Sequence, residues 1–461
     1  MKLMTYERKL SGDTETPISI FSNYVGDKTG FLLESKEMPR GRYSFMAADP
    51  YMTIRAYKDK IETVMDDTIE TIYGNALELV EKLMSSIEVT NTTDLPFIGG
   101  AVGTVGYDMI RNYEDLPDNN EDTIGTPDSH LLFVKEMVVY DHHFQQIHII
   151  CLDTIDDEGL RKCEKRFDEI EDLLHTAHGL SKKSQPLDID FTTNMTQEEY
   201  MKSVEKAKQY IYDGDIFQVV LSQRLSGKAD NVDSFNLYRK LRQVNPSPYM
   251  YYFNMEDYSI VGSSPEMLVQ MKDDQILNCP IAGTRKIGKT EEENQALAAD
   301  LLADEKERAE HMMLVDLGRN DMGKISEIDS VKVESLMQVH RYSHVMHLVS
   351  LVSGLRRPGL SMFDVLMSFL PAGTLSGAPK IRAMEIIDEL ENRRRGNYGG
   401  AIGYFGFNGN MDMCIAIRTM IIKDDIINIQ AGAGIVADSD PVKEYEETIN
   451  KAKALVTAIT K

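Results

Sequence analysis

Two pairs of glutamates are the residues best suited to chemistry in this sequence. The stretch DEKERAEHMMLVD, residues 304–316, contains Glu307 and Glu310, and SDPVKEYEETINKAKALV, residues 439–456, contains Glu444 and Glu447. Residues three apart lie on one face of a helix, so each pair concentrates negative charge on one face. A buried pair of this kind requires a cation or a proton to remove the charge.

Two interpretations of these pairs are open from the residues alone. Each pair could form a solvated acidic face, which is the commoner case. Alternatively, the two pairs could share a divalent cation, because hard cations such as Mg²⁺ select carboxylate oxygen. Lys451 follows Glu447 by four positions, so it could be a surface ion-pair partner or part of the same site.

Helices are predicted to carry both pairs. A capping box from Thr290 to Glu293 begins a helical pattern that ends near Gly318 and includes the first pair. Pro441 suits the first turn of a second helix, after Ser439 and Asp440 as candidate caps.

The rest of the chain predicts an α+β protein in two parts. A polar segment separates residues 1–185 from residues 195–461, and a capping box at Thr196 and Glu199 opens a helix after it. A hairpin is expected around a polar turn at Asp141 to His143. Helices and strands do not alternate regularly, which favours α+β over a doubly wound sheet.

Composition excludes several classes of function. The 461 residues are 42% hydrophobic and 27% charged, which is typical of globular proteins. A net charge of −24 disfavours binding to nucleic acid or anionic membranes. Four separated cysteines, no apolar leader and no run of 18 apolar residues predict a cytoplasmic protein with neither disulfides nor membrane spans. The glycine-rich stretches match no nucleotide-binding motif.

Seven phrases, taken together and in order, resemble the chorismate-utilising enzymes, and among them most closely the anthranilate synthase component I (large subunit) family. They are PIAGTRKIGKT, DEKERAEHMMLVDLGRNDMG, YSHVMHLVS, PAGTLSGAPKIRAMEII, NYGGAIGYFG, CIAIRT and GAGIVADSDPVKEYEETINKA. The resemblance implies a β-sandwich core flanked by helices, with residues 1–185 as a regulatory N-terminal α+β domain and residues 195–461 as the chorismate-binding catalytic domain.

The same resemblance implies a Mg²⁺ cofactor and a set of substrate contacts. Glu310 and Glu447 are expected as direct metal ligands, and Glu307 and Glu444 as ligands through water. The expected contacts to chorismate are Arg418 and Tyr398 on the enolpyruvyl carboxylate, Gly283, Thr284, Thr374, Gly432 and Gly434 around the ring, and Lys451 near the metal and carboxylate.

Two residues match the catalytic acid and base of the family. Glu266 is expected to protonate the departing C4 hydroxyl, because a carboxylic acid kept neutral can supply that proton. His347 is expected to remove the C2 proton as pyruvate leaves. His340 and His344 are interpreted as structural.

Two further positions separate this chain from its relatives. Isochorismate and salicylate synthases carry a water-activating lysine where this sequence has Gln218, so hydroxylation is disfavoured. Aminodeoxychorismate synthases commonly carry a nucleophilic lysine where Ala282 stands. Some of them lack it, so aminodeoxychorismate synthase component I remains an alternative. A different class of alternative is a catalytically inactive regulator that binds chorismate or tryptophan.

The resemblance also implies partners and an inhibitor. No glutaminase motif occurs in the chain, so ammonia from glutamine would require a separate glutamine amidotransferase subunit (component II). The expected reaction is the first step of tryptophan biosynthesis, with tryptophan as feedback inhibitor. The expected inhibitor contacts are Glu34, Ser35, Asn245, Pro248, Tyr249 and Met250.

Overall fold

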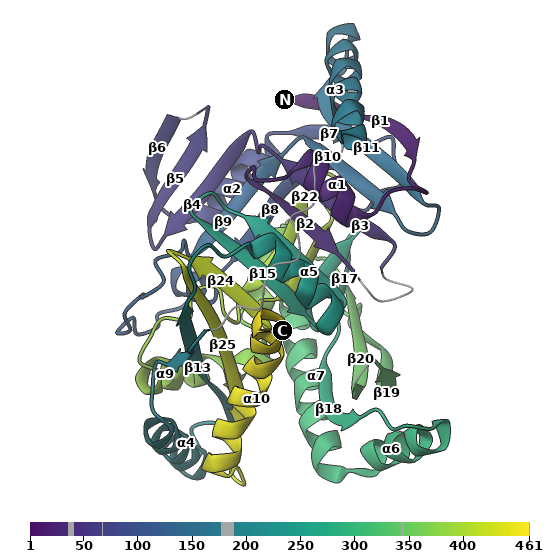
Figure 1. Ribbon diagram of the computed structural model, residues 1–461. Coiled ribbons are helices and arrows are strands. Elements are labelled where there is room, and N and C mark those ends of the chain that lie inside the picture. The colour runs from purple at the N-terminus through teal and green to yellow at the C-terminus, as the bar shows by residue number, and fades with distance from the viewer. Residues whose placement is uncertain (36–40, 67, 177–188, 343–344, 461) are drawn as a thin grey trace.

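Two large, mainly antiparallel β-sheets form the centre of the molecule in the computed structural model (Figure 1). The structure describes residues 1–35, 41–66, 68–176, 189–342 and 345–460. Among them, no helix is both long enough and apolar enough to cross a membrane.

The first sheet has thirteen strands within the described residues. In spatial order they are β12 (Thr192–Thr193), β13 (Gln218–Lys228), β25 (Ile426–Ile435), β24 (Thr419–Lys423), β15 (Tyr258–Ser264), β14 (Tyr249–Asn254), β2 (Gly30–Glu34), β3 (Tyr43–Ala48), β10 (Glu136–Asp141), β11 (Gln146–Thr154), β1 (Lys2–Ser11) and β7 (Glu88–Thr90), with β21 (Gly377–Ala378) paired to β13. The predicted hairpin is confirmed as β10 and β11.

The second sheet has twelve strands over the same part of the chain. Their order is β18 (Ile281–Lys286), β20 (Val345–Leu355), β17 (Gln275–Asn278), β16 (Met267–Lys272), β23 (Met411–Ile415), β22 (Ala401–Gly406), β8 (Gly100–Val105), β9 (Ser129–Val134), β4 (Met52–Tyr57), β5 (Lys60–Met65) and β6 (Thr68–Tyr73), with β19 (Lys332–Arg341) paired to β20.

Both sheets combine strands from the two ends of the sequence. In the first sheet β2 pairs with β14, placing Leu32 opposite Tyr252, and in the second sheet β8 pairs with β22. The predicted division into two domains at residues 185–195 stays a prediction. Part of that segment lies outside the described residues. Whatever the domain boundary, the two parts share continuous hydrogen-bonded sheets.

The two sheets pack face to face, as the predicted β-sandwich requires. The apolar cluster between them takes Phe45 from the first sheet and Tyr404 from the second, and both contact Phe97. The ring centroid of Phe97 lies 5.7 Å from that of Phe45 and 4.4 Å from that of Tyr404. Such buried aromatic pairs stabilise the interface between sheets beyond their burial of apolar area.

Helices cover the outer faces of both sheets. Helices α1 (Pro17–Tyr24), α3 (Asp157–His175), α5 (Ser234–Val244) and α10 (Pro441–Thr460) pack on the first sheet. Helices α2 (Ala76–Ser85), α7 (Glu305–Ile325) and α8 (Met362–Phe369) pack on the second sheet. Helices α4 (Gln197–Tyr212) and α9 (Lys380–Leu390) pack on β13 and β25, and the remaining elements are α6 (Glu291–Ala303) and the short helices η1 (Tyr107–Asn112) and η2 (Gly373–Leu375).

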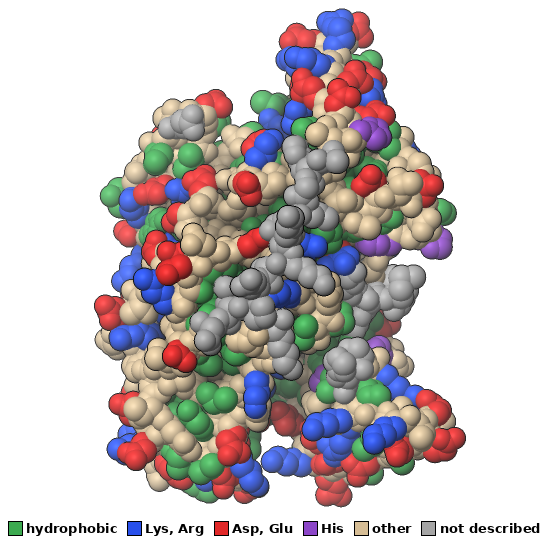
Figure 2. Space-filling model, viewed as in Figure 1, with side chains coloured by type: hydrophobic (Ala, Val, Ile, Leu, Met, Phe, Trp, Pro, Cys, Tyr) green, Lys and Arg blue, Asp and Glu red, His purple; other side chains and the backbone are tan. Residues whose placement is uncertain are grey.

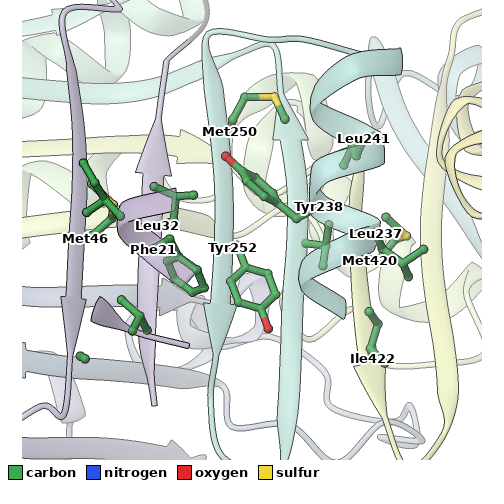
Figure 3. Packing of buried hydrophobic residues seen from close by; sticks show 14 of the residues in the cluster. Phe21, Leu32, Met46, Leu237, Tyr238, Leu241, Met250, Tyr252, Met420 and Ile422 are labelled. Atoms are coloured by element: carbon green, nitrogen blue, oxygen red, sulfur yellow. The ribbon is translucent and has the colours of Figure 1, made fainter. Parts of the chain in front are cut away.

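Helix α5 illustrates how these outer layers form. Its apolar side chains recur at helical spacing on one face, with Leu237, Tyr238 and Leu241 buried. They lie over Met250 of β14 and Met420 of β24, as Figure 3 shows. The α+β architecture with a helix-covered sandwich is thus confirmed.

The helix that carries the first glutamate pair differs from the prediction. The expected single helix from Thr290 to Gly318 is two helices, α6 and α7, and the second continues to Ile325. The break occurs at Asp304, whose carboxylate accepts hydrogen bonds from the backbone N–H groups of Lys306 and Glu307 and so caps α7.

The predicted caps are present at the other helices. Thr196 and Glu199 form the complete capping box of α4. Asp440 caps α10 by accepting from the backbone N–H of Val442 and Lys443. Thr290 caps α6, but the carboxylate of Glu293 accepts from Lys289 instead of closing the box.

Candidate active site

A cavity of about 760 Å³ lies between α7 and α10, which face each other in the lower half of Figure 1. Its walls come from both sheets and both helices. It is lined by all the side chains and glycines predicted for catalysis, substrate and metal, namely Gln218, Glu266, Gly283, Thr284, Glu307, Glu310, His347, Thr374, Tyr398, Arg418, Gly432, Gly434, Glu444, Glu447 and Lys451. The structure therefore brings these residues together, while their individual roles remain predictions.

Glu266 lies immediately before β16, and both its backbone and its side chain are held by hydrogen bonds. Its carbonyl accepts from the N–H of Ile415, and its carboxyl Oε1 accepts from the hydroxyl of Thr374 at 3.0 Å. Burial raises the pKa of this carboxyl to about 7, although the Thr374 hydrogen bond and the charge of Lys451 act to lower the pKa. Near neutral pH a large fraction of Glu266 is thus protonated and able to donate.

His347 projects from β20 into the same cavity. Its Nδ1 lies 2.8 Å from the carbonyl oxygen of Gly283 and 3.1 Å from the hydroxyl of Thr284. A carbonyl can only accept, so Nδ1 carries the hydrogen and Nε2 has the lone pair of a base. Burial lowers the pKa of His347, which keeps the ring neutral.

Arg418 and Tyr398 form a cationic and polar part of the wall. Burial lowers the pKa of Arg418, and the nearby Tyr398 and Glu447 oppose that shift. Among the described residues no carboxylate forms an ion pair with Arg418, whereas Arg395 behind it is paired with Glu391 at 2.5 Å. The Arg418 guanidinium is therefore free to form an ion pair with the carboxylate of a substrate.

Two glycines of β25 allow the side chains of Gln218 and Tyr398 to approach the strand closely. A Cβ at Gly434 would lie 2.7 Å from Nε2 of Gln218, and a Cβ at Gly432 would lie 2.9 Å from the Tyr398 hydroxyl. Any larger residue would displace these two side chains. The carbonyl of Gly432 also accepts from Nζ of Lys451 at 2.9 Å.

Lys451 combines the two roles that the sequence left open. Its Nζ lies 2.7 Å from Glu447 on α10, as in the i,i+4 surface pair. The same ammonium binds the Gly432 carbonyl and lines the cavity. It is therefore held at the site and is not a freely rotating surface lysine.

The four glutamates line the cavity from opposite sides. Burial, followed by the charge of Glu307, raises the pKa of Glu310, and the charge of Glu447 on the facing helix adds to this shift. Burial also raises the pKa of Glu444, with a further contribution from Glu447. The negative charges on α7 and α10 therefore repel each other across the cavity.

These carboxylates have the chemistry of a Mg²⁺ site but not its closed geometry. Oxygen ligands from acidic residues suit this ion, and a divalent cation would relieve the repulsion that raises the pKa values. Within the described residues, however, no group of three acidic, histidine or cysteine side chains is close enough to hold a metal. Direct binding would require the carboxylates on α7 and α10 to come closer together than they lie here.

The glutamate pair on α7 has a partner that sequence reasoning missed. Arg285 of β18 binds Asp300 at the end of α6, Asp304 at the helix break and Glu307, with distances of 2.7, 2.7 and 3.1 Å. It therefore fixes where α7 begins relative to β18. Arg285 lies within the motif PIAGTRK, three residues after Ala282. Its place in that motif was the sequence feature that could have identified it as a site residue.

The neighbouring histidines behave differently from His347. His311, next to Glu310, points into the core, where its Nε2 lies 2.6 Å from the Ser350 hydroxyl. His340 lies on β19 and does not line the cavity. His344 lies outside the described residues.

A second cavity of about 290 Å³ contains most of the residues predicted to bind an inhibitor. It is lined by Glu34, Ser35, Pro248, Tyr249 and Met250, together with residues from between the sheets. Asn245 lines the active-site cavity, and its role toward an inhibitor stays a prediction. Pro248 borders both cavities, so the 245–248 segment separates them.

The side chains of Glu34 and Ser35 differ in their hydrogen bonding. The carboxylate of Glu34 is buried and already accepts two hydrogen bonds from Arg242, at 2.8 and 2.9 Å, and one from the Tyr238 hydroxyl. The hydroxyl of Ser35 is buried without a hydrogen-bond partner among the described residues. Buried polar groups are normally paired, so the Ser35 hydroxyl is the group that a ligand would satisfy.

Comparison with known proteins agrees with this geometry. The family model described as chorismate binding enzyme matches residues 29–457. The chain belongs to the chorismate-binding enzymes. Proteins named anthranilate synthase component 1 are similar to it over nearly their whole length: the one from Acetivibrio thermocellus is 50% identical, covering 97% of this chain and 93% of its own, and that from Aquifex aeolicus is 45% identical, covering 97% and 92%.

Solved structures show the same relationship for this chorismate-binding enzyme. Anthranilate synthase component I from Streptococcus pneumoniae superimposes with a TM-score of 0.83 at 43% identity, covering 91% of this chain and 93% of that one. The isochorismate synthase MenF from Escherichia coli superimposes with a TM-score of 0.76 at 18% identity, covering 99% and 94%, which shows a shared fold only.

Proposed function

We propose that this chain is the large component of an anthranilate synthase, which converts chorismate and ammonia to anthranilate, pyruvate and water. The observation that carries the proposal is that Glu266 and His347, the expected acid and base, line one cavity together with Gln218, which stands where isochorismate synthases are expected to carry a water-activating lysine. Relatives that are 41–50% identical and carry the name anthranilate synthase component 1 support it.

The first chemical step is addition of ammonia to C2 of the chorismate ring. The double bonds shift along the ring, the C4–O bond breaks, and Glu266 donates its proton so that water leaves instead of hydroxide. The proton released from the new C–N centre restores Glu266. A carboxyl with a pKa near 7 suits both the donation and the recovery.

The second step is elimination of pyruvate. Nε2 of His347 removes the C2 proton while the C3–O bond breaks, and the ring becomes aromatic. The pyruvate enolate that leaves takes up a proton at its methylene carbon to give pyruvate. Arg418 and Tyr398 hold the enolpyruvyl carboxylate in this scheme, so the leaving group stays oriented during the step. The Gly283 carbonyl holds the His347 tautomer that can accept the proton.

Mg²⁺ is part of the proposal. When bound by Glu310 and Glu447, with Glu307 and Glu444 through water, the ion would neutralise the acidic walls and bind the ring carboxylate of chorismate. The repulsion between Glu310 on α7 and Glu447 on α10 supports the proposal. Arg285 would keep Glu307 in position for that role.

Purified protein incubated with chorismate, MgCl₂ and ammonium salt at alkaline pH tests the proposal. We expect the aromatic product to be the ortho-aminobenzoate, identified by mass and retention time. Accumulation of 4-amino-4-deoxychorismate would instead identify an aminodeoxychorismate synthase component I. An unchanged chorismate concentration would indicate a binding protein without activity.

Replacing His347 with alanine should separate the two steps. Without the base, elimination should slow by about 100-fold, while addition of ammonia continues. The aminated intermediate that still carries the enolpyruvyl group should accumulate, and mass spectrometry of quenched reactions would detect it. Anthranilate formation at the parental rate would show that His347 is not the base.

We also propose that tryptophan inhibits the enzyme by binding the second cavity. Its volume, apolar walls and unpaired Ser35 hydroxyl suit an amino acid with an indole ring. Because Pro248 borders both cavities, a ligand there can change the active-site wall if it binds one arrangement of the 245–248 segment more tightly.

A Ser35→Arg variant tests this regulation. The longer side chain should fill the cavity, so the tryptophan concentration for half inhibition should rise at least about tenfold, while activity without tryptophan changes little. Initial rates measured across a tryptophan series would give both values. Equal inhibition of parent and variant, or no inhibition of the parent at millimolar tryptophan, would contradict the proposal.

A further inference from the structure

Arg395 and Glu391 form a buried ion pair behind the wall of the active-site cavity. Arg395 is 2% exposed and Glu391 is 6% exposed. The carboxylate of Glu391 accepts from Nε of Arg395 at 3.0 Å and from Nη2 at 2.5 Å, so the pair is bidentate. Burial acts to lower the pKa of Arg395, but the charge of Glu391 outweighs burial and the pKa is raised. The guanidinium therefore stays charged in the interior.

The same guanidinium binds the backbone of two segments of the cavity wall. Its Nη1 donates to the carbonyl of Leu375 at 2.6 Å, and its Nη2 donates to the carbonyl of Val220 at 2.8 Å. Leu375 ends η2 and Val220 lies on β13, and both residues line the cavity. Arg395 therefore holds η2 and β13 at a fixed spacing.

The short helix η2 carries the hydrogen-bond partner of the proposed catalytic acid. Thr374 directly precedes Leu375, and its hydroxyl donates to Oε1 of Glu266 at 3.0 Å. A shift of η2 would move this hydroxyl away from Glu266. The hydrogen bond from Arg395 to the Leu375 carbonyl opposes such a shift, because it holds the residue next to Thr374.

Arg395 also holds Tyr398, through both the ring and the backbone. Cζ of Arg395 lies 5.6 Å from the centroid of the Tyr398 ring, which is within the range of a cation–π contact. The backbone N–H of Tyr398 donates to the carbonyl of Arg395 at 3.1 Å. Tyr398 and Arg418 are the residues proposed to hold the enolpyruvyl carboxylate, so a displacement of Arg395 would disturb that contact.

Glu391 holds the ion pair against β13. Its Oε1 accepts from the backbone N–H and from the hydroxyl of Ser222, both at 2.8 Å. Oγ of Ser222 in turn accepts at 2.9 Å from Nε2 of Gln430, which lines the cavity. A buried ion pair contributes little more stability than well-packed apolar side chains of similar volume. An apolar pair, however, could not supply these directed hydrogen bonds to the cavity wall.

We infer that Arg395, held by Glu391, is a positioning residue for the reaction, an inference that rests on the proposed function. Arg395 does not line the cavity, so it acts through the residues that do. Through Tyr398 it affects how tightly chorismate binds. Through Thr374 it holds the carboxyl of Glu266 where the C4 hydroxyl departs.

An Arg395→Lys variant tests this role. Lysine keeps a positive charge beside Glu391, but one ammonium group cannot replace the planar set of hydrogen bonds to Glu391, Leu375 and Val220. Calorimetric titration with chorismate and MgCl₂, without ammonium, should give a dissociation constant at least about tenfold above the parent's.

Steady-state kinetics separate positioning from a loss of folded protein. In Arg395→Lys the Michaelis constant for chorismate should rise and the turnover number should fall, while the Michaelis constant for ammonium stays unchanged. A smaller fraction of folded enzyme would lower the turnover number alone and leave both Michaelis constants as in the parent.

A double variant tests the route through Thr374. Thr374→Val removes the hydroxyl that binds Glu266 and keeps the branched shape of the side chain. If Arg395 acts through Thr374, adding Arg395→Lys to Thr374→Val should lower the turnover number by less than Arg395→Lys does in the parent. Two losses that simply multiply would overturn the inference.

Arg166→Lys is the matched control. Arg166 forms the same bidentate contact with Glu136, through Nε at 2.5 Å and Nη2 at 3.0 Å. It belongs to α3, which lies at the top of Figure 2 with charged side chains of both signs on its surface, away from α7 and α10. This variant should keep the chorismate affinity and the turnover number within about twofold of the parent.

Glu391→Gln provides a second variant of the pair. It keeps the shape of the side chain but removes the charge that orients Arg395, and it should weaken chorismate binding in the same direction. Circular dichroism checks that each variant is folded. Failure of both Arg395→Lys and Glu391→Gln to fold would show a structural role alone and would overturn the inference.

The remaining outcomes are equally decisive. Parental chorismate affinity and Michaelis constants in folded Arg395→Lys would overturn the inference, as would equal losses in Arg395→Lys and Arg166→Lys. If the parent binds chorismate but makes no anthranilate, and Arg395→Lys weakens that binding, the positioning of Tyr398 stands and the proposed function fails.

Discussion

Replacing Glu266 with glutamine should reduce anthranilate formation by at least about 100-fold, because general acid catalysis typically contributes 10² to 10⁴ in rate. Glutamine keeps the shape of the side chain and can still accept from the Thr374 hydroxyl at the position where Glu266 does so at 3.0 Å. It cannot donate a proton to the C4 oxygen. Steady-state rates with chorismate and ammonium would measure the loss, and a rate near the parent's would contradict the assignment.

The same variant should be more stable than the parent at alkaline pH. The ordinary pKa of 4.5 is raised to about 7 in the folded protein. Below pH 4.5 the carboxyl is protonated in both states, but between pH 4.5 and 7 the unfolded chain ionises while the folded chain keeps its proton. Stability of the parent is therefore lost as pH rises through this window, by up to about 3 kcal/mol.

Thermal unfolding of the two proteins tests this consequence. The melting temperature of Glu266→Gln should exceed that of the parent at pH 8, and the difference should shrink as the pH falls toward 5. A difference that does not depend on pH would show that Glu266 is not held protonated by burial. Because unfolding is measured without substrate, this result is independent of the catalytic assay.

Glu310→Gln and Glu447→Gln should each lower activity by more than about 100-fold. Each change removes one charge and one carboxylate oxygen from the acidic walls and keeps the volume, and loss of even an outer partner of a metal costs about 10- to 100-fold. Calorimetric titration with MgCl₂ in the presence of chorismate should show correspondingly weaker binding. Circular dichroism should show an unchanged fold.

Glu446→Gln is the control for this pair of variants. Glu446 precedes Glu447 on α10, is exposed, and does not line the cavity. It should leave both Mg²⁺ binding and activity within about twofold of the parent. Parental activity and Mg²⁺ affinity in Glu310→Gln and Glu447→Gln would contradict the metal site.

Local features of the fold were predictable because they depend on nearby residues. The caps at Thr196 and Asp440 follow from side chains that accept backbone N–H groups within three positions. The break at Asp304 uses the same chemistry, but helical periodicity on both sides concealed it. A capping aspartate inside a helical pattern was the signal that could have located the break.

Long-range pairing could not be obtained in this way. Nothing near Leu32 specifies that it lies opposite Tyr252, because that register depends on packing across the whole sandwich. The partners of Glu34 and Glu307 are likewise distant, since Arg242 and Arg285 reach them from other elements. The site residues could be identified because each lies in a short sequence motif of the family, although the residues are far apart in the sequence.

A single reaction with ¹⁵N-labelled ammonium most directly tests the central claim that the cavity joins ammonia to chorismate and then releases pyruvate. We expect anthranilate that carries the label, formed together with an equal amount of pyruvate and only when chorismate and Mg²⁺ are both present. Formation of isochorismate, of labelled 4-amino-4-deoxychorismate, or of no product from chorismate would contradict the account.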